Sequence, residues 1–319
     1  MKWMSATPSN LWRHVARLFY AAALVFIALS VWSNLGSLRE ASAELSWAYV
    51  SLSFVAACLG HLLNALVWWR LTVSMDIALP PVRTARAWFL SRLGRYIPGK
   101  IPLLLLRIAE YERYPKKSVA LAFGLEYVMS LLSACLLVLL ALALSPEGFP
   151  ELLRLIALVG TTVFLLCLHP SVLKRGMNFL LGLFRRQPLA EVPSFGANLL
   201  YVAAYTAVGA VHGLSFYFML CSVQPVPLSH LPIITGVYYG ASLVGIAVLI
   251  APAGLGVTEG MLFLVLPLII PKTSVIIGAI AIRLLLVVAD VALAGVFYLL
   301  DAAAGLSTTE EHSNSSPCR

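Results

Sequence analysis

The chain has 319 residues, of which 61% are hydrophobic and 11% are charged, and its formal net charge at pH 7 is +8. Soluble globular domains carry about 25% charged residues, so this composition leaves too little polar surface for a water-exposed fold. The excess of Lys and Arg does not indicate nucleic-acid binding, because these residues lie at the ends of apolar runs rather than in one basic patch. The composition predicts an all-α polytopic membrane protein.

Apolar runs of about 20 residues are long enough to cross a bilayer as helices. The predicted spans are 18–36, 46–69, 118–144, 151–168, 197–221 and 274–300. Basic residues precede the first run, and the sequence ASA at 41–43 is similar to a signal-peptide cleavage site. We interpret this run as an uncleaved first helix, because the internal repeat described below requires it.

Two further apolar segments are interrupted by Pro and Gly. They are residues 84–113, around the sequence YIPGKIP at 96–102, and residues 231–270, around APAGLG at 251–256. Pro removes a backbone donor and clashes with the preceding turn, so neither segment is expected to be one straight helix. Irregular backbone at membrane depth is tolerated only inside protein or beside a water-filled cavity, so we interpret both as re-entrant hairpins of two half-helices. The alternative is a bundle with two kinked helices and no functional symmetry.

The order span, span, hairpin, span occurs twice. The sequence PKKSV at 115–119 opens the third span, and PKTSV at 271–275 opens the sixth, 156 residues later. This predicts two repeats, 1–145 and 146–304, followed by a disordered cytoplasmic tail, 305–319. The positions of Lys and Arg place both termini in the cytoplasm and give the two repeats inverted orientations in the cell inner membrane.

The first hairpin contains several ionisable residues, which are costly at membrane depth and therefore candidates for function. Arginine forks and a lysine point charge together suit a phosphate group. The candidates are Arg92, Arg95, Lys100 and Arg107. The alternatives are that these side chains reach the cytoplasmic surface without binding a specific ligand, and that Arg107 pairs with Glu110 or Glu112.

The second hairpin has glycines at its break. Gly254 and Gly256 would let a headgroup approach the backbone closely, and Thr258 is suited to cap the half-helix that follows. The N-terminus of that half-helix would present free N–H groups and a positive dipole end to an anion. Glu259 follows in the first turn, either as a binding residue or as a favourable charge at the helix N-terminus.

Three charged residues lie within the third and sixth spans. Glu126 and Arg283 follow the prolines that open these spans by 11 and 12 residues, so they occupy corresponding places in the two repeats. We interpret them either as an ion pair between the repeats or as a substrate or proton site. Asp290, seven residues beyond Arg283 on the same helix face, is an alternative partner for Arg283.

The remaining polar groups carry weaker signals. His61 and His212 are expected to be hydrogen-bonded within the bundle, with proton coupling as the alternative. Tyr96, Tyr238 and Tyr239 are interpreted as interfacial aromatic residues. The five cysteines show no metal-ligand spacing, and no GxxxxGK[ST] loop occurs, so neither a metal nor another cofactor is expected.

These motifs resemble the transmembrane region of lysylphosphatidylglycerol synthases, a flippase-like superfamily that also occurs as standalone membrane proteins. The resemblance covers residues 15–300 and rests on YIPGK at 96–100 with Arg107, on Glu126-Tyr127, and on PAGLGVTE at 252–259 with Arg283. Members commonly have Arg where this chain has Thr258. The resemblance implies lipid translocation or support of a lipid-modifying pathway. The synthases carry a soluble aminoacyl-transferase domain after the membrane part, and the tail from Ser307 is too short to form one, so the chain is not expected to make aminoacylated lipid.

The leading hypothesis is a flippase that moves an anionic lipid, either a modified phospholipid or a polyprenyl-phosphate lipid, by rocking of two inverted halves. One alternative is a membrane-embedded transferase or hydrolase, for which the sequence shows no cluster of nucleophiles or metal-binding carboxylates. Another is a non-transporting scaffold for a lipid-pathway enzyme. The expected partners are the lipid, the bilayer, and either a second copy or such an enzyme, without enzymatic activity of the chain itself.

Overall fold

A computed structural model describes residues 45–97, 101–144, 151–167, 169–183, 194–247 and 257–314. Throughout these ranges the chain is helical between short turns and contains no strand. Four helices are long and apolar enough to cross a membrane, and they confirm four of the predicted spans. They are α2 (Trp47–Ser74), α5 (Lys116–Ala143), α8 (Phe195–Val223) and α11 (Lys272–Asn314), the last over Lys272–Ala304. The predicted span at 151–168 corresponds to a shorter helix, α6 (Glu151–Cys167), and the predicted span at 18–36 lies outside the described residues.

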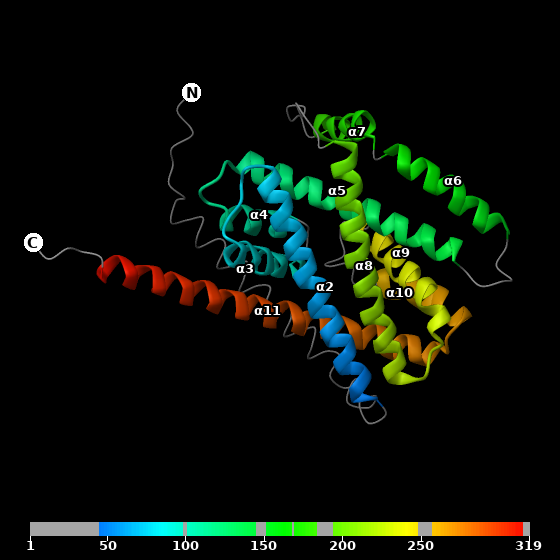
Figure 1. The fold of residues 1–319 in the computed structure, drawn as a ribbon. Helices are drawn as coiled ribbons and strands as arrows, with labels where there is room; N and C mark the ends of the chain where they lie inside the picture. The colour runs from blue at the N-terminus through cyan, green and yellow to red at the C-terminus, as the bar shows by residue number, and fades with distance from the viewer. Residues whose placement is uncertain are drawn as a thin grey trace, which may run out of the picture.

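Helices α2 and α8 cross side by side in the centre of the bundle (Figure 1). At this crossing the hydroxyl group of Ser53 donates to the carbonyl oxygen of Ser215, and the Ser215 hydroxyl donates to the Ser53 carbonyl, each at 2.8 Å. A Cβ atom added to Gly60 would lie only 2.7 Å from Cε1 of His212. Small residues allow this approach, which stabilises membrane helices because lipid provides no hydrophobic drive between them.

We expect Gly60→Ala to destabilise the protein by about 1–3 kcal/mol, because the added methyl group meets the ring of His212, which is itself buried. Gly124→Ala in α5 is the matched control, since no neighbouring atom lies within 4 Å of the Cβ atom that it adds. Thermal unfolding of the purified variants in one detergent measures the difference. Equal stability of the two variants would contradict the tight crossing of α2 and α8.

Each segment interrupted by Pro and Gly forms two helices that contact one another, which confirms that neither is a single straight helix. The first consists of α3 (Pro81–Arg92), the 3-10 turn η1 (Leu93–Tyr96) and α4 (Ile101–Glu110). The second consists of α9 (Leu231–Ala247), preceded by the 3-10 turn η2 (Leu228–His230), and of α10 (Val257–Val265) with the 3-10 turn η4 (Leu266–Leu268). Residues 98–100 and 248–256, where the chain passes between the paired helices, lie outside the described residues.

Helix α11 contacts elements of both predicted repeats. It packs against α3 and α2 from the first and against α8 and α10 from the second, and its C-terminal part extends beyond the bundle (Figure 1). The helix continues to Asn314 and so includes much of the tail that was predicted to be disordered from residue 305. Helices α6 and α7 (Pro170–Leu183) lie at the edge of the bundle, and α7 occupies a stretch for which no helix was predicted.

Apolar side chains cover the outer surfaces of the long helices. On α2, for example, Leu52, Val55 and Leu59 are 48%, 63% and 48% exposed. Such exposure on successive turns is typical of surfaces that contact lipid rather than water. The described chain is therefore the helical bundle of a multi-pass membrane protein, and its buried polar groups lie between the helices.

Candidate functional site

A buried carboxylate on α11, that of Asp290, contacts polar and charged residues at the end of α3 and in the turn η1. The side chain of Asp290 is fully buried, and its Oδ1 accepts a hydrogen bond from Nε of Arg92 at 2.7 Å. Its Oδ2 accepts a hydrogen bond from the hydroxyl group of Tyr96 at 2.7 Å, and a terminal nitrogen of Arg95 lies 3.9 Å from the same oxygen. We call these four residues, together with His61, the Asp290 cluster.

Two histidines connect the Asp290 cluster to the central helix crossing. His61 of α2 is fully buried, with Nε2 3.3 Å from Oδ1 of Asp290. Its ring centroid lies 4.8 Å from that of His212 on α8, whose Nε2 is 3.4 Å from Nδ2 of Asn64. Within the described residues, neither ring nitrogen of His61 has a hydrogen-bond partner, so its contact with Asp290 is one of proximity alone. Both histidines therefore contact each other where α2 meets α8, and His61 also adjoins a carboxylate.

Positive charge exceeds negative charge in the Asp290 cluster, which holds two arginines and one carboxylate. Arg92 forms an ion pair with Asp290 and lies over the ring of Trp88, with Cζ 4.8 Å from the ring centroid. Arg95 is more accessible, with a side chain 34% exposed, and Asp290 is its one acidic neighbour within 4 Å among the described residues. Its guanidinium group is thus placed to bind an additional anion.

Arg107 lies in a separate buried ion pair. It is 2% exposed, and a terminal nitrogen lies 3.3 Å from Oε2 of Glu126 on α5. Its Nε donates to the hydroxyl oxygen of Ser91 at 2.6 Å, and its Cζ lies 4.2 Å from the ring centroid of Trp68. The other carboxylate oxygen of Glu126 accepts a hydrogen bond from Nε1 of Trp88 at 2.9 Å. These contacts occupy Arg107 within the protein, and they replace the predicted alternative of a pair with Glu110 or Glu112.

The structure corrects both predicted partners of Arg283. This residue forms an ion pair with Glu259 of α10, not with Glu126 or with Asp290. Arg107 of α4 pairs with Glu126 of α5, and Glu259 of α10 pairs with Arg283 of α11. Each pair joins the second helix of an interrupted segment to the long helix that follows it, with the signs exchanged.

The other predicted binding residues have mixed outcomes. Helix α10 begins at Val257, so Thr258 lies within its first turn and is not the N-cap. Glu259 lies in that first turn, as predicted. Gly254, Gly256 and Lys100 lie outside the described residues. The structure thus brings Arg92 and Arg95 together and directs Arg107 and Glu259 into ion pairs.

Sequence reasoning missed two members of the Asp290 cluster. Tyr96, interpreted as an interfacial aromatic residue, is 7% exposed and donates to Asp290. His61 was expected to be hydrogen-bonded, but neither of its ring nitrogens has a hydrogen-bond partner among the described residues, and it lies beside the Asp290 carboxylate instead. Their signal was weak, because it consisted only of a position beside Arg95 and of a polar residue inside an apolar run. No group of three His, Cys, Asp or Glu residues that could hold a metal ion occurs within the described ranges.

The fold and the Asp290 cluster define an integral membrane protein with a buried, positively charged site where broken helices meet long ones. A family model described as the lysylphosphatidylglycerol synthase TM region matches residues 19–294. Because this match covers most of the chain, the protein belongs to that family. A search of curated proteins gave no match.

Proposed function

We propose that this protein moves an anionic, phosphate-containing lipid between the two leaflets of the membrane, and that Arg95 binds the phosphate. The observation that carries the proposal is the excess positive charge of the Asp290 cluster, where Arg92 is neutralised by Asp290 and Arg95 remains accessible. Charges buried at membrane depth are costly and mark substrate or ion pathways. Membership of a family of membrane regions named for lipid synthases supports a lipid as the substrate.

The same proposal includes two inverted halves, each with a re-entrant hairpin, in the inner membrane with both termini in the cytoplasm. Corresponding residues support the repeat: His61 and His212 are 151 residues apart, Arg107 and Glu259 are 152 apart, and their partners Glu126 and Arg283 are 157 apart. Inverted repeats with broken helices are typical of transporters that rock around a central site.

In this mechanism the lipid phosphate completes the charge balance of the Asp290 cluster. Arg95 exchanges its 3.9 Å contact with Asp290 for a fork of hydrogen bonds to the phosphate. Asp290 is on α11 and Arg92 is at the end of α3, so charge changes at the cluster act directly on the contact between the halves. No chemical step is involved. Association with a second copy or with a lipid-pathway enzyme stays a prediction.

The test is transport by purified protein in vesicles. Fluorescent phosphatidylglycerol and a fluorescent polyprenyl phosphate are loaded in turn, and the fraction that becomes accessible to a membrane-impermeant quencher is followed with time. We expect Arg95→Gln to slow the wild-type rate for at least one probe by about tenfold, because it removes a charge-assisted contact worth roughly 1.5–3 kcal/mol.

Arg70→Gln is the matched control, since Arg70 is exposed near the end of α2 and lies outside the Asp290 cluster. It is expected to transport like the wild type. If vesicles with wild-type protein are no faster than protein-free vesicles for either probe, the translocation proposal fails. If Arg95→Gln transports as fast as the wild type, the assignment of the phosphate site fails.

A further inference from the structure

A second group of arginines surrounds a pocket at the other end of α3 and α4. The pocket has a volume of about 260 Å³ and lies between the residues that open α3 and those that follow α4. Arg83 is nine residues before Arg92 on α3, a separation of roughly 13 Å along the helix. The pocket is therefore distinct from the Asp290 cluster.

One of its arginines is held by carboxylates of the protein itself. Arg86 lies 3.1 Å from Oε2 of Glu110 on α4 and also pairs with Asp301 near the end of α11. This bridge ties three helices together beneath the pocket. Arg86 has two acidic partners, so its charge is already compensated. Its side chain is held in place at the edge of the pocket and is not available to a ligand.

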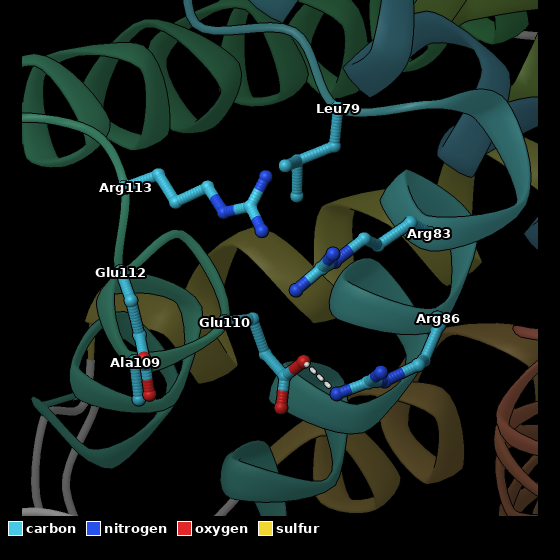
Figure 2. Close-up of a pocket in the computed structure, with 7 residues that line it drawn as sticks. All are labelled: Leu79, Arg83, Arg86, Ala109, Glu110, Glu112 and Arg113. Carbon is cyan, nitrogen blue, oxygen red and sulfur yellow. Dashed lines mark hydrogen bonds and ion pairs between the residues drawn. The ribbon is translucent and has the colours of Figure 1, made fainter. Parts of the chain in front are cut away.

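The other two arginines point into the same space. Figure 2 shows the guanidinium groups of Arg83 and Arg113 directed toward one another, with Glu112 turned away from both. Among the described residues, no carboxylate lies within 4 Å of either guanidinium group. Arg83 is half-buried, Arg113 is exposed, and the buried Leu79 forms an apolar wall beside them. Within the described part of the chain the pocket thus presents two guanidinium groups without a direct ion-pair partner, although Glu110 and Glu112 also line it.

Two convergent guanidinium groups suit a phosphate group in particular. Each fork can donate two parallel hydrogen bonds, and a phosphate offers several oxygens in different directions, whereas a carboxylate offers two in one plane. We propose that Arg83 and Arg113 bind the phosphate group of a lipid headgroup or of a soluble phosphate at this pocket. The site is a binding site in its own right and does not depend on the proposed translocation.

The test is calorimetric titration of the full chain in a maltoside detergent, which contains no phosphate, with inorganic phosphate and a short-chain phosphatidylglycerol as separate probes. We expect Arg83→Gln/Arg113→Gln to weaken binding by about tenfold or more, since it removes two charge-assisted donors. The matched control is Lys116→Gln/Lys117→Gln, which removes the same charge from two exposed residues near the pocket that do not line it.

Two further measurements and the comparison of the two probes make the result decisive. Arg83→Lys/Arg113→Lys keeps the charge without the forks, so an intermediate affinity is expected and also shows that the variants fold. The arginine-dependent binding is expected to persist in an Arg95→Gln background, which separates this pocket from the Asp290 cluster. Binding of both probes indicates recognition of the phosphate group alone, binding of phosphatidylglycerol alone indicates a headgroup site, and binding of inorganic phosphate alone indicates a soluble ligand.

Two outcomes overturn the proposal. The first is that neither probe binds the wild type at millimolar concentration. The second is that the paired lysine substitutions weaken binding as much as the paired arginine substitutions, because the attraction would then belong to the whole basic surface.

Discussion

Asp290→Asn is expected to destabilise the protein by about 3–5 kcal/mol, because it leaves Arg92 in the protein interior without its carboxylate. The amide has almost the size of the carboxylate, so no cavity forms, and its oxygen can still accept a hydrogen bond from Tyr96. The decrease in the free energy of unfolding therefore measures the effect of removing the negative charge of Asp290. Chemical unfolding in one detergent, followed by tryptophan fluorescence, measures the free energy of unfolding.

Asp301→Asn is the control for this prediction. Asp301 also pairs with an arginine of α3, but Arg86 keeps Glu110 as a second partner, and both side chains of the Asp301 pair are partly exposed. We expect a loss of about 1 kcal/mol or less. An equal decrease in the free energy of unfolding for the two variants would show that burial does not increase the contribution of Asp290 to stability.

A double variant isolates the interaction. If the charge pair is responsible, Asp290→Asn combined with Arg92→Gln loses less stability than the sum of the two single losses, by roughly 1–3 kcal/mol. Strict additivity would contradict a direct coupling between α3 and α11 through these side chains, and with it the idea that this contact connects the two halves.

The apolar runs predicted where the long helices begin, because the bilayer sets both the length and the character of a spanning helix. Helices α2, α5, α8 and α11 each start within two residues of the predicted span. Pro115 precedes α5, as the sequence PKKSV at the opening of the third span predicts. Two far ends were less predictable: α2 continues through Arg70 to Ser74 and α11 to Asn314, since a helix does not stop where its apolar stretch does.

Charged side chains are costly inside a membrane, and this cost identified Arg92 and Arg95 as candidate site residues. It could not identify the residues with which they pair. Asp290 shares a helix face with Arg283, yet seven residues are two turns, roughly 10 Å apart along the axis. Neighbouring helices approach more closely than that, so Arg92 of α3 reaches Asp290 and Glu259 of α10 reaches Arg283. Which helices are neighbours is a property of the tertiary fold, and no local pattern around these residues encodes it.

The second large effect is expected for Arg107→Gln, with a loss of about 3–5 kcal/mol. Arg107 is 2% exposed, so the substitution leaves Glu126 with a charge that water reaches poorly, and it also removes the stacking on Trp68. Arg107→Lys is expected to lose less, because it keeps the charge but not the fork or the planar stack. The free energy of unfolding, measured as for Asp290→Asn, gives the ranking.

Arg283→Gln provides the matched comparison. Arg283 and Glu259 join α11 to α10 as Arg107 and Glu126 join α4 to α5, but their side chains are 25% and 17% exposed, against 2% and 13% for Arg107 and Glu126. Burial raises the cost of leaving one partner behind, so we expect the loss for Arg283→Gln to be clearly smaller than that for Arg107→Gln. Equal losses would mean that the two ion pairs contribute alike to stability despite their different burial. The expected inequality would instead mean that burial decides how much each ion pair stabilises the helical bundle, since water screens the more accessible pair.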